Sequence, residues 1–299
     1  MNRIKCAFCG SDQYSLVVQA KDYRLHTTDQ VFDLVRCLRC GLIYLNPRPD
    51  EGELSIFYPN TFYAEQTVMS RFFSDFLNGS KLREVASFKK TGRILDVGCG
   101  EGGLIFAFKA RGWAAFGVDT SKVATGLTGE KIGKQYTFNG ELKDCHFPDG
   151  YFDVVILNHV LEHVAHPNEE LKEIGRILKD DGVLLLSVPN IDSFQFKICR
   201  GRWVHLDVPR HLFHYSPATI RYMLQKNNFK VIYVNFPLSD FPFDFYRSLR
   251  STAKLSKLLL MLDPFLLLAS LALKMIPRFR GTMKVAAKKA SSGSCPLTG

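Results

Sequence analysis

The sequence predicts an α/β fold, in which helices cover a mostly parallel sheet, preceded by a small metal-binding ribbon. Two observations carry this prediction. From residue 93 onward, short apolar segments alternate with segments of helical periodicity, which is the pattern of a parallel sheet covered on both faces. Residues 1–50 instead contain two Cys-x-x-Cys pairs, which indicate a metal site.

The totals describe an ordinary globular protein. The 299 residues are 46% hydrophobic and 23% charged, which is enough to bury one large core or two unequal cores and excludes a disordered chain. Residues 1–13 contain two cysteines and no apolar run. We therefore expect no secretory leader and a cytoplasmic location.

The two cysteine pairs have the spacing of a structural zinc site. Cys6 and Cys9 are separated by 27 residues from Cys37 and Cys40. Four converging sulfurs make the closed tetrahedral site that zinc prefers. In a chain without a leader, such pairs are metal ligands before they are disulfides. The sequence predicts a zinc-ribbon domain over residues 1–50, whose metal stabilises the fold and takes no part in catalysis.

The remaining elements follow in order. Residues 51–92 are predicted to be a linker and helical lead-in, with a helix over 68–90. The main domain is predicted at 93–290, followed by a disordered tail at 291–299. Its predicted strands are 93–97, 114–118, 135–138, 153–157, 182–188, 229–236 and 282–289. Its predicted helices are 103–111, 121–131, 168–179 and 217–227, the last of them capped by Ser216.

The loop after the first main strand, DVGCGEGG, fits two cofactor templates. Gly98, Gly100 and Gly103 have the spacing of a dinucleotide loop. Asp96, Gly98 and Gly100 have the D-x-G-x-G spacing of an S-adenosylmethionine loop. Both templates bring a ligand against bare backbone at the start of a helix.

Two acidic residues bear on that choice. Asp96 would lie unfavourably close to a pyrophosphate, but it suits the ammonium group of a methionine moiety. Asp119 ends the second strand, where a carboxylate accepts hydrogen bonds from ribose hydroxyls in both templates. Asp96 therefore favours S-adenosylmethionine, whereas Asp119 supports a nucleoside without choosing between the two templates.

Four segments, DVGCGEGG, GVD, DGYFDVVILNHVLEHV and GVLLLSVPN, resemble the class I S-adenosylmethionine-dependent methyltransferases. With CAFCGS and CLRCGLIYLNPRP ahead of them, the chain resembles the branch that carries an N-terminal zinc ribbon. The resemblance implies a Rossmann-like seven-stranded sheet whose last strand is reversed, in agreement with the late strand expected at 282–289.

The resemblance also implies where the cofactor lies. Asp96, Gly98 and Gly100 would line its methionine and ribose side, and Asp119 would hold the ribose. The other expected contacts come from the following loops: Glu141 and Leu142 beside the adenine, and Asn158 and His159 beside the methionine and the sulfonium.

Methyl transfer to a hydroxyl needs a base, and histidine is the side chain that titrates nearest neutral pH. We expect His211, between the fifth strand and the next helix, or His163, after the fourth strand, to take this role. The alternatives are substrate binding or loop packing for His211 and bracing of its loop for His163. Trp203 and Arg210 are expected to be pocket walls or structural residues.

The net charge of +10 is concentrated near the end of the chain. Residues 241–299 carry ten Lys or Arg and two Asp, around an apolar insert at 255–277. Its core, Leu258 to Leu273, is too short to cross a bilayer and is interrupted by Asp263-Pro264. It is expected either to lie in the interface of an anionic membrane, making the protein peripheral to it, or to pack on the domain or dimerise.

The function that these observations favour is methylation of a small-molecule, glycan or lipid-linked acceptor, most simply on oxygen. A nucleic-acid methyltransferase using the ribbon as a reader is disfavoured, since no Pro-Pro-aromatic segment follows the fourth strand and the basic residues do not follow a groove. A non-catalytic cofactor-binding scaffold and a dinucleotide oxidoreductase are the remaining alternatives. Neither the acceptor nor the oligomeric state follows from the sequence.

Overall fold

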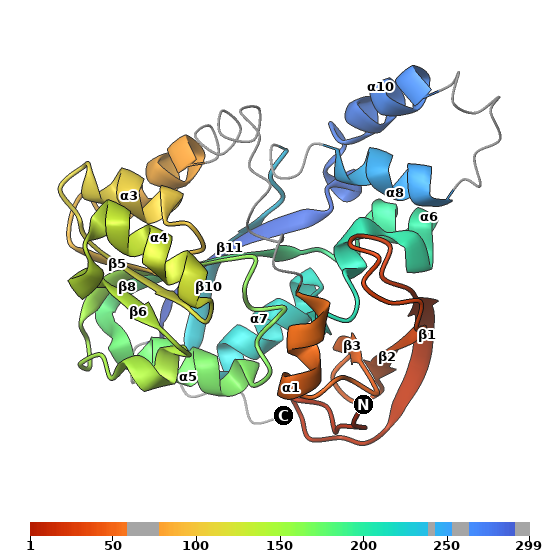
Figure 1. The fold of residues 1–299 in the computed structure, drawn as a ribbon, viewed down its shortest axis with the longest axis horizontal. Coiled ribbons are helices and arrows are strands. Elements are labelled where there is room, and N and C mark those ends of the chain that lie inside the picture. Colours follow the sequence, from red (N-terminus) through yellow and green to blue (C-terminus); the bar gives the residue numbers. More distant parts are fainter. Residues whose placement is uncertain (59–77, 239–242, 253–262, 291–299) are drawn as a thin grey trace.

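The computed structural model describes residues 1–58, 78–238, 243–252 and 263–290 (Figure 1). Its centre is a sheet of seven strands in the order β10-β11-β8-β7-β4-β5-β6. The strands are β4 (Arg93–Val97), β5 (Ala114–Asp119), β6 (Thr137–Asn139), β7 (Phe152–Asn158), β8 (Leu178–Pro189), β10 (Phe229–Asn235) and β11 (Thr282–Lys289). β4 to β8 run parallel, whereas β11 is antiparallel to both of its neighbours. The predicted fold class, with its reversed last strand, is confirmed.

Helices cover both faces of this sheet. One face packs against a helix at 78–86, α3 (Gly103–Lys109) and α4 (Lys122–Ile132). The other packs against α5 (Pro167–Ile177) and α7 (Pro217–Lys226). Successive strand residues point to opposite faces, so Ile94 joins the first core and Leu95 the second. Both faces of the sheet are therefore buried, which is why the sequences of these strands are unbroken apolar runs.

The predicted element boundaries differ from the observed ones at β8, which begins at Leu178 and not at 182, and around the glycine-rich segment after α4. Gly133, with φ of +100°, ends α4, and a short 3-10 turn at Lys134–Tyr136 follows. The strand expected at 135–138 therefore begins at Thr137. By contrast, the predicted cap of α7 is present, since the Ser216 hydroxyl accepts a hydrogen bond from the amide of Thr219 at 3.1 Å. Residues 68–77 of the predicted lead-in helix and the tail at 291–299 lie outside the described residues.

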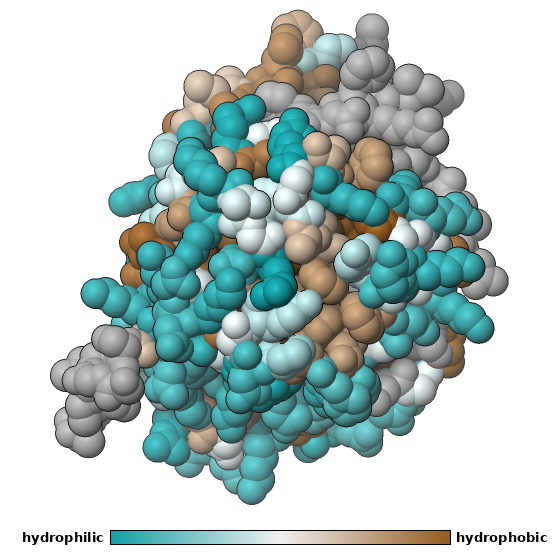
Figure 2. Space-filling view, turned by 90° about the vertical axis from the view of Figure 1, so that its left-hand side faces the viewer, coloured by the Kyte–Doolittle hydropathy of each residue, from teal (hydrophilic) through white to brown (hydrophobic). Residues whose placement is uncertain are grey.

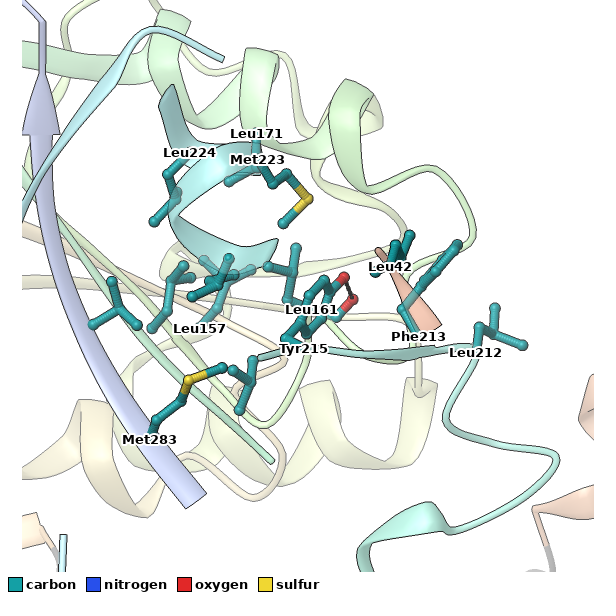
Figure 3. Close-up of a cluster of buried hydrophobic side chains, with 14 of the residues drawn as sticks. Leu42, Leu157, Leu161, Leu171, Leu212, Phe213, Tyr215, Met223, Leu224 and Met283 are labelled. Atoms are coloured by element: carbon teal, nitrogen blue, oxygen red, sulfur yellow. Dashed lines mark hydrogen bonds between the residues drawn. The ribbon is translucent and has the colours of Figure 1, made fainter. Parts of the chain in front are cut away.

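The N-terminal segment forms three strands of a second, smaller sheet, whose fourth strand comes from the main domain. β1 (Tyr14–Ala20), β2 (Phe32–Cys37), β3 (Ile43–Leu45) and β9 (Phe213–His214) pair antiparallel in that order. The hydrophobic core is continuous across both parts: Figure 3 shows Leu42 near Phe213, with Met223 of α7 and Met283 of β11 in the same cluster. The ribbon thus has no core separate from the main sheet.

A buried ion-pair network joins the two parts. Arg210 is completely buried and binds both oxygens of Asp22, at 2.6 and 3.0 Å, from the N-terminal segment. The same guanidinium binds Asp207 at 2.6 Å, and Arg24 pairs with the second oxygen of Asp207 at 2.6 Å. Burial alone would raise the pKa of Asp22, but Arg210 and Thr27 outweigh it and hold that pKa well below its usual range.

The apolar insert is described only in part. α8 (Asp244–Thr252) and α10 (Asp263–Leu273) pack against each other away from the main sheet (Figure 1), while 253–262 lie outside the described residues. The carboxylate of the buried Asp244 accepts a hydrogen bond from Lys274 Nζ at 2.9 Å and lies 3.0 Å from His205 Nε2. These contacts anchor the helix pair. The outer side of α10 exposes Phe265 and Leu268, at 70% and 64%. In the described parts of the chain, no helix is long and apolar enough to span a bilayer.

The opposite end of the molecule has a different surface. Figure 2 shows the side with the β6 edge of the sheet, α3 and α4, where hydrophilic side chains dominate and hydrophobic atoms are interspersed. Scattered apolar exposure of this kind is ordinary for a globular protein. By contrast, α10 exposes two large apolar side chains, Phe265 and Leu268, on one side of a single helix.

The Asp22–Arg210 pair predicts a large stability effect. Asp22→Asn removes one charge from a buried pair, which should cost about 3 kcal/mol of unfolding free energy. The matched control is Asp149→Asn, which breaks an ion pair with Arg176 in which Asp149 is 81% exposed; it should cost less than about 1 kcal/mol. Urea denaturation of both variants measures the difference. Equal losses would show that the buried pair does not join the two parts.

Candidate functional site

The glycine loop between β4 and α3 is tightly folded against its neighbours. The amides of Gly98 and Cys99 both donate to the Val118 carbonyl, at 2.7 and 3.0 Å. Gly98 has φ of +70°, and a Cβ there would come within 2.3 Å of the Val160 side chain. Gly100 has φ of +53°, but a Cβ there would meet nothing within 4 Å. Gly98 is therefore required for packing, whereas Gly100 borders open space where a ligand can approach the backbone.

Asp96 lies buried at the end of β4, with 4% of its surface exposed. Burial raises the pKa of Asp96 to about 7, Lys81 lowers it in part, and Asp119 raises it further. Lys81 comes from the helix at 78–86, where it is buried and bonds to the Ser187 hydroxyl at 3.3 Å. Because the pKa of Asp96 is close to neutral pH, a cationic ligand would stabilise the ionised form of its carboxyl group.

Asp119 is held in one orientation by the backbone around it. Its Oδ2 accepts from the Gly100 amide at 2.9 Å and its Oδ1 from the Ser121 amide at 2.8 Å. Each carboxylate oxygen keeps a further lone pair, which is what two ribose hydroxyls require. The loop that carries Gly100 and the expected ribose-binding acid are thus joined directly.

The other expected cofactor residues are spread over two loops. Glu141 is exposed and pairs with Lys143 at 2.7 Å. Leu142 as a whole is 1% exposed and belongs to the core. Asn158, at the end of β7, is exposed. His159 follows with φ of +57°, its amide bonded to the Ser187 carbonyl at 2.8 Å.

The two histidines expected to act as bases lie together. The rings of His163 and His211 meet edge to face with centroids 4.6 Å apart. Burial lowers the pKa of His163, although Glu162 opposes it, and burial lowers the pKa of His211 well below its ordinary value. Both rings are therefore neutral near pH 7. His211 is only 4% exposed, which separates it from solvent and from a large acceptor.

His159 is more exposed than His211 and, like His163, is only partly buried. Its side chain is 18% exposed, and its Nδ1 lies 3.2 Å from a carboxylate oxygen of Glu162. A buried carboxylate that accepts from Nδ1–H fixes the orientation of a histidine and stabilises its imidazolium form. Sequence reasoning passed over Glu162, although a charged residue within the apolar run VVILNHVLEHV was a usable signal. It also passed over Lys81 and Asp207, whose long-range partners leave no local pattern.

The four predicted zinc ligands are brought together by the fold. The sulfurs of Cys6, Cys9, Cys37 and Cys40 all lie within 4.8 Å of one another, and the cysteines are free thiols. The Gly10 amide donates to the Cys6 carbonyl at 2.8 Å, and the Gly41 amide donates to the Cys37 carbonyl at 3.0 Å. These two matching turns point all four thiols at one centre, so the residues fit a tetrahedral metal ion.

Comparison with known proteins agrees with this geometry. The profile of a methyltransferase domain family matches residues 69–234, more than half of the chain. The chain belongs to that family. Membership favours S-adenosylmethionine over a dinucleotide as the cofactor and explains why Asp96, Gly100 and Asp119 meet at one edge of the sheet.

Named relatives are similar over part of their length. The chain is 31% identical over 133 residues to a ubiquinone biosynthesis O-methyltransferase of Dechloromonas aromatica, covering 42% of this chain and 56% of that protein. It is 34% identical over 148 residues to the protein of the same name from Maricaulis maris, covering 45% and 57%. The chain thus spans little more than half of either relative.

A solved structure shares the fold at low identity. An S-adenosylmethionine-dependent methyltransferase from Archaeoglobus fulgidus superposes with a TM-score of 0.51 at 19% identity, over 72% of this chain and 94% of that one. The [4+2]-cyclase SpnF superposes with a TM-score of 0.50 at 20% identity, over 72% and 80%. The fold alone therefore does not decide the reaction, which has to be argued from the residues of the site.

Proposed function

We propose that this protein transfers a methyl group from S-adenosylmethionine to a small-molecule, glycan or lipid-linked acceptor, with oxygen as the receiving atom. The observation that carries the proposal is the pair of buried acids, Asp96 and Asp119, on either side of the open Gly100 backbone. The cofactor, when bound, supplies an electrophilic methyl group on a positively charged sulfur. The names of the two O-methyltransferase relatives support oxygen as the acceptor atom.

The chain's own residues would hold the cofactor by charge and hydrogen bonding. Asp96 would bind the methionine ammonium and Asp119 the ribose hydroxyls, while Glu141 and the backbone of Leu142 would flank the adenine. Asn158 and His159, at the carboxyl end of β7, would lie toward the methionine. Fixing donor and acceptor in this way lowers the entropic cost of an in-line displacement.

We propose that His159 takes the proton of the acceptor hydroxyl, in preference to the buried His211 and to His163, whose ring contacts that of His211. Its partial exposure and its bond to Glu162 support this role. Glu162 would then stabilise the imidazolium that forms when Nε2 takes the proton. The loop that carries Val160, packed on Gly98, keeps this histidine next to the cofactor loop.

Radiolabel transfer tests the activity. The purified protein is incubated with methyl-labelled S-adenosylmethionine and a fractionated cell extract, and label is expected in the small-molecule, glycan or lipid fraction. Asp119→Ala should abolish transfer by abolishing cofactor binding, whereas His159→Gln should lower turnover at least about a hundredfold with cofactor affinity retained. Label in RNA, or undiminished transfer by Asp119→Ala, would contradict the proposal.

The raised pKa of Asp96 predicts pH-dependent cofactor binding. Only the ionised carboxylate attracts the ammonium group, so affinity for S-adenosylmethionine should rise by about tenfold between pH 5.5 and 7.0, below the ordinary pKa of an α-amino group. Calorimetric titration at several pH values measures this rise. Asp96→Asn should bind weakly at every pH, and a flat profile for the unmodified protein would refute the assignment.

We also propose that the four-cysteine cluster holds one structural zinc ion. Two knuckles that converge on one centre and the absence of a fifth ligand among the described residues near it support a closed site. Elemental analysis should find one zinc per cluster, lost in Cys6→Ser, with a fall in melting temperature. Cys145→Ser, outside the cluster, is the control and should keep its zinc. Retention of zinc by Cys6→Ser would exclude the cluster as its site.

A lipid-linked acceptor would account for the outer face of α10. Its exposed Phe265 and Leu268, followed in the chain by the exposed Arg278, suit an apolar-and-basic contact with an anionic membrane surface. Peripheral contact through 255–277 stays a prediction, and label recovered in the lipid fraction of the transfer experiment would support it.

A further inference from the structure

Three side chains near the candidate base form a cluster, of which the proposed methyl transfer uses only one oxygen of Glu162. Glu162 and His163 come from the loop after β7, and His211 comes from the loop before β9. One carboxylate oxygen of Glu162 and one nitrogen of each ring all lie within 4.8 Å of one another. The cluster is separate from the four cysteines.

The hydrogen bonds of the two rings determine which nitrogens can accept. His211 Nδ1 lies 2.9 Å from the His205 carbonyl oxygen. A carbonyl can only accept, so Nδ1 of His211 carries the hydrogen, and Nε2 of that neutral ring keeps a lone pair. His163 Nδ1 lies 3.1 Å from the Arg210 carbonyl oxygen and 3.0 Å from the Tyr58 hydroxyl, which can donate or accept. Either tautomer of a neutral His163 has one nitrogen with a lone pair.

Glu162 adds a third group without a donor. Its side chain is completely buried, and one oxygen accepts from His159 at 3.2 Å. The other oxygen, Oε2, is buried and has no hydrogen-bond partner among the residues that the structure describes. A buried carboxylate oxygen without a hydrogen-bond partner is energetically unfavourable.

The charged side chains around the cluster pair with one another and leave Oε2 of Glu162 without a partner among the described residues. Asp207 lies 3.6 Å from His211 Nε2, but it pairs with Arg24 and Arg210. Asp22 uses the remaining side of Arg210, so two arginines face two aspartates. The network is balanced without Glu162, and a cation beside Oε2 would complete it.

We propose that Glu162, His163 and His211 bind one divalent transition-metal cation. Two imidazoles and one carboxylate suit Zn²⁺, Fe²⁺, Co²⁺ or Mn²⁺ better than Mg²⁺ or Ca²⁺, which prefer oxygen ligands. Metal-binding histidines ordinarily donate their other N–H to a carbonyl or carboxylate, as His211 does to the His205 carbonyl. Three protein ligands leave a coordination position for an oxygen of a ligand. The assignment does not depend on methyl transfer.

Cobalt titration of the full chain tests this site. With the zinc content of the cysteine cluster checked before and after, Co²⁺ is added and followed by visible absorption and calorimetry. We expect one additional ion per chain, with the weak visible bands of nitrogen and oxygen ligation. Strong near-ultraviolet thiolate bands would mean that Co²⁺ had displaced zinc from the cysteines. Their appearance as the sole signal would overturn the proposal.

Matched variants locate the ion. Glu162→Gln and His211→Gln should each weaken Co²⁺ binding by more than about tenfold. His214→Gln is the control, because His214 is equally buried and its ring centroid lies 6.2 Å from that of His211, but it is outside the cluster. If a variant fails to fold by circular dichroism, His163→Gln replaces it. Unchanged affinity in the folded variants, or no binding by the unmodified protein at millimolar Co²⁺, would refute the site.

Discussion

The completely buried Arg210 is the constraint on which the arrangement of this molecule depends. Its guanidinium binds Asp22, which follows β1 of the smaller sheet, and Asp207 from its own loop, and both carboxylates are buried with it. Burying these charges is costly unless each is paired, so the network forms only when the two parts of the chain are in place. His211, the next residue, and His163, bonded to the Arg210 carbonyl, are positioned by the same contact. The ion pairs therefore set the geometry of the histidine cluster.

Much of the fold could be predicted because local patterns encode it. The apolar runs of β4, β7 and β8 and the cap at Ser216 are read directly from neighbouring residues, and the reversed last strand follows from a family resemblance. The pairing of β3 with β9 could not be predicted, because a two-residue strand leaves no periodicity. The exact start of β6 was lost for a related reason, since the turn after Gly133 depends on local backbone geometry.

The candidate site divides in the same way. Asp96, Gly100 and Asp119 belong to a short motif at the ends of adjacent strands, so sequence reasoning places them together correctly. Lys81, on a helix that precedes the sheet, is buried near Asp96, and only the tertiary structure reveals this proximity. The histidines were recognised as chemically capable, but their burial and mutual contact could not be known from spacing. Glu162 matters because of one unpaired oxygen, which no pattern reports.

Because β9 of the main domain completes the smaller sheet, the ways in which such a protein can be recombined are limited. Residues 1–50 look like an interchangeable cassette in the sequence, yet their sheet is completed by Phe213 and His214, and their acid Asp22 needs Arg210. Grafting the cassette onto another methyltransferase would leave an open edge and an uncompensated carboxylate on the graft. The two segments must therefore diverge together, with the loop that carries Asp207 and Arg210 and the cysteine-bearing segment inherited as one unit.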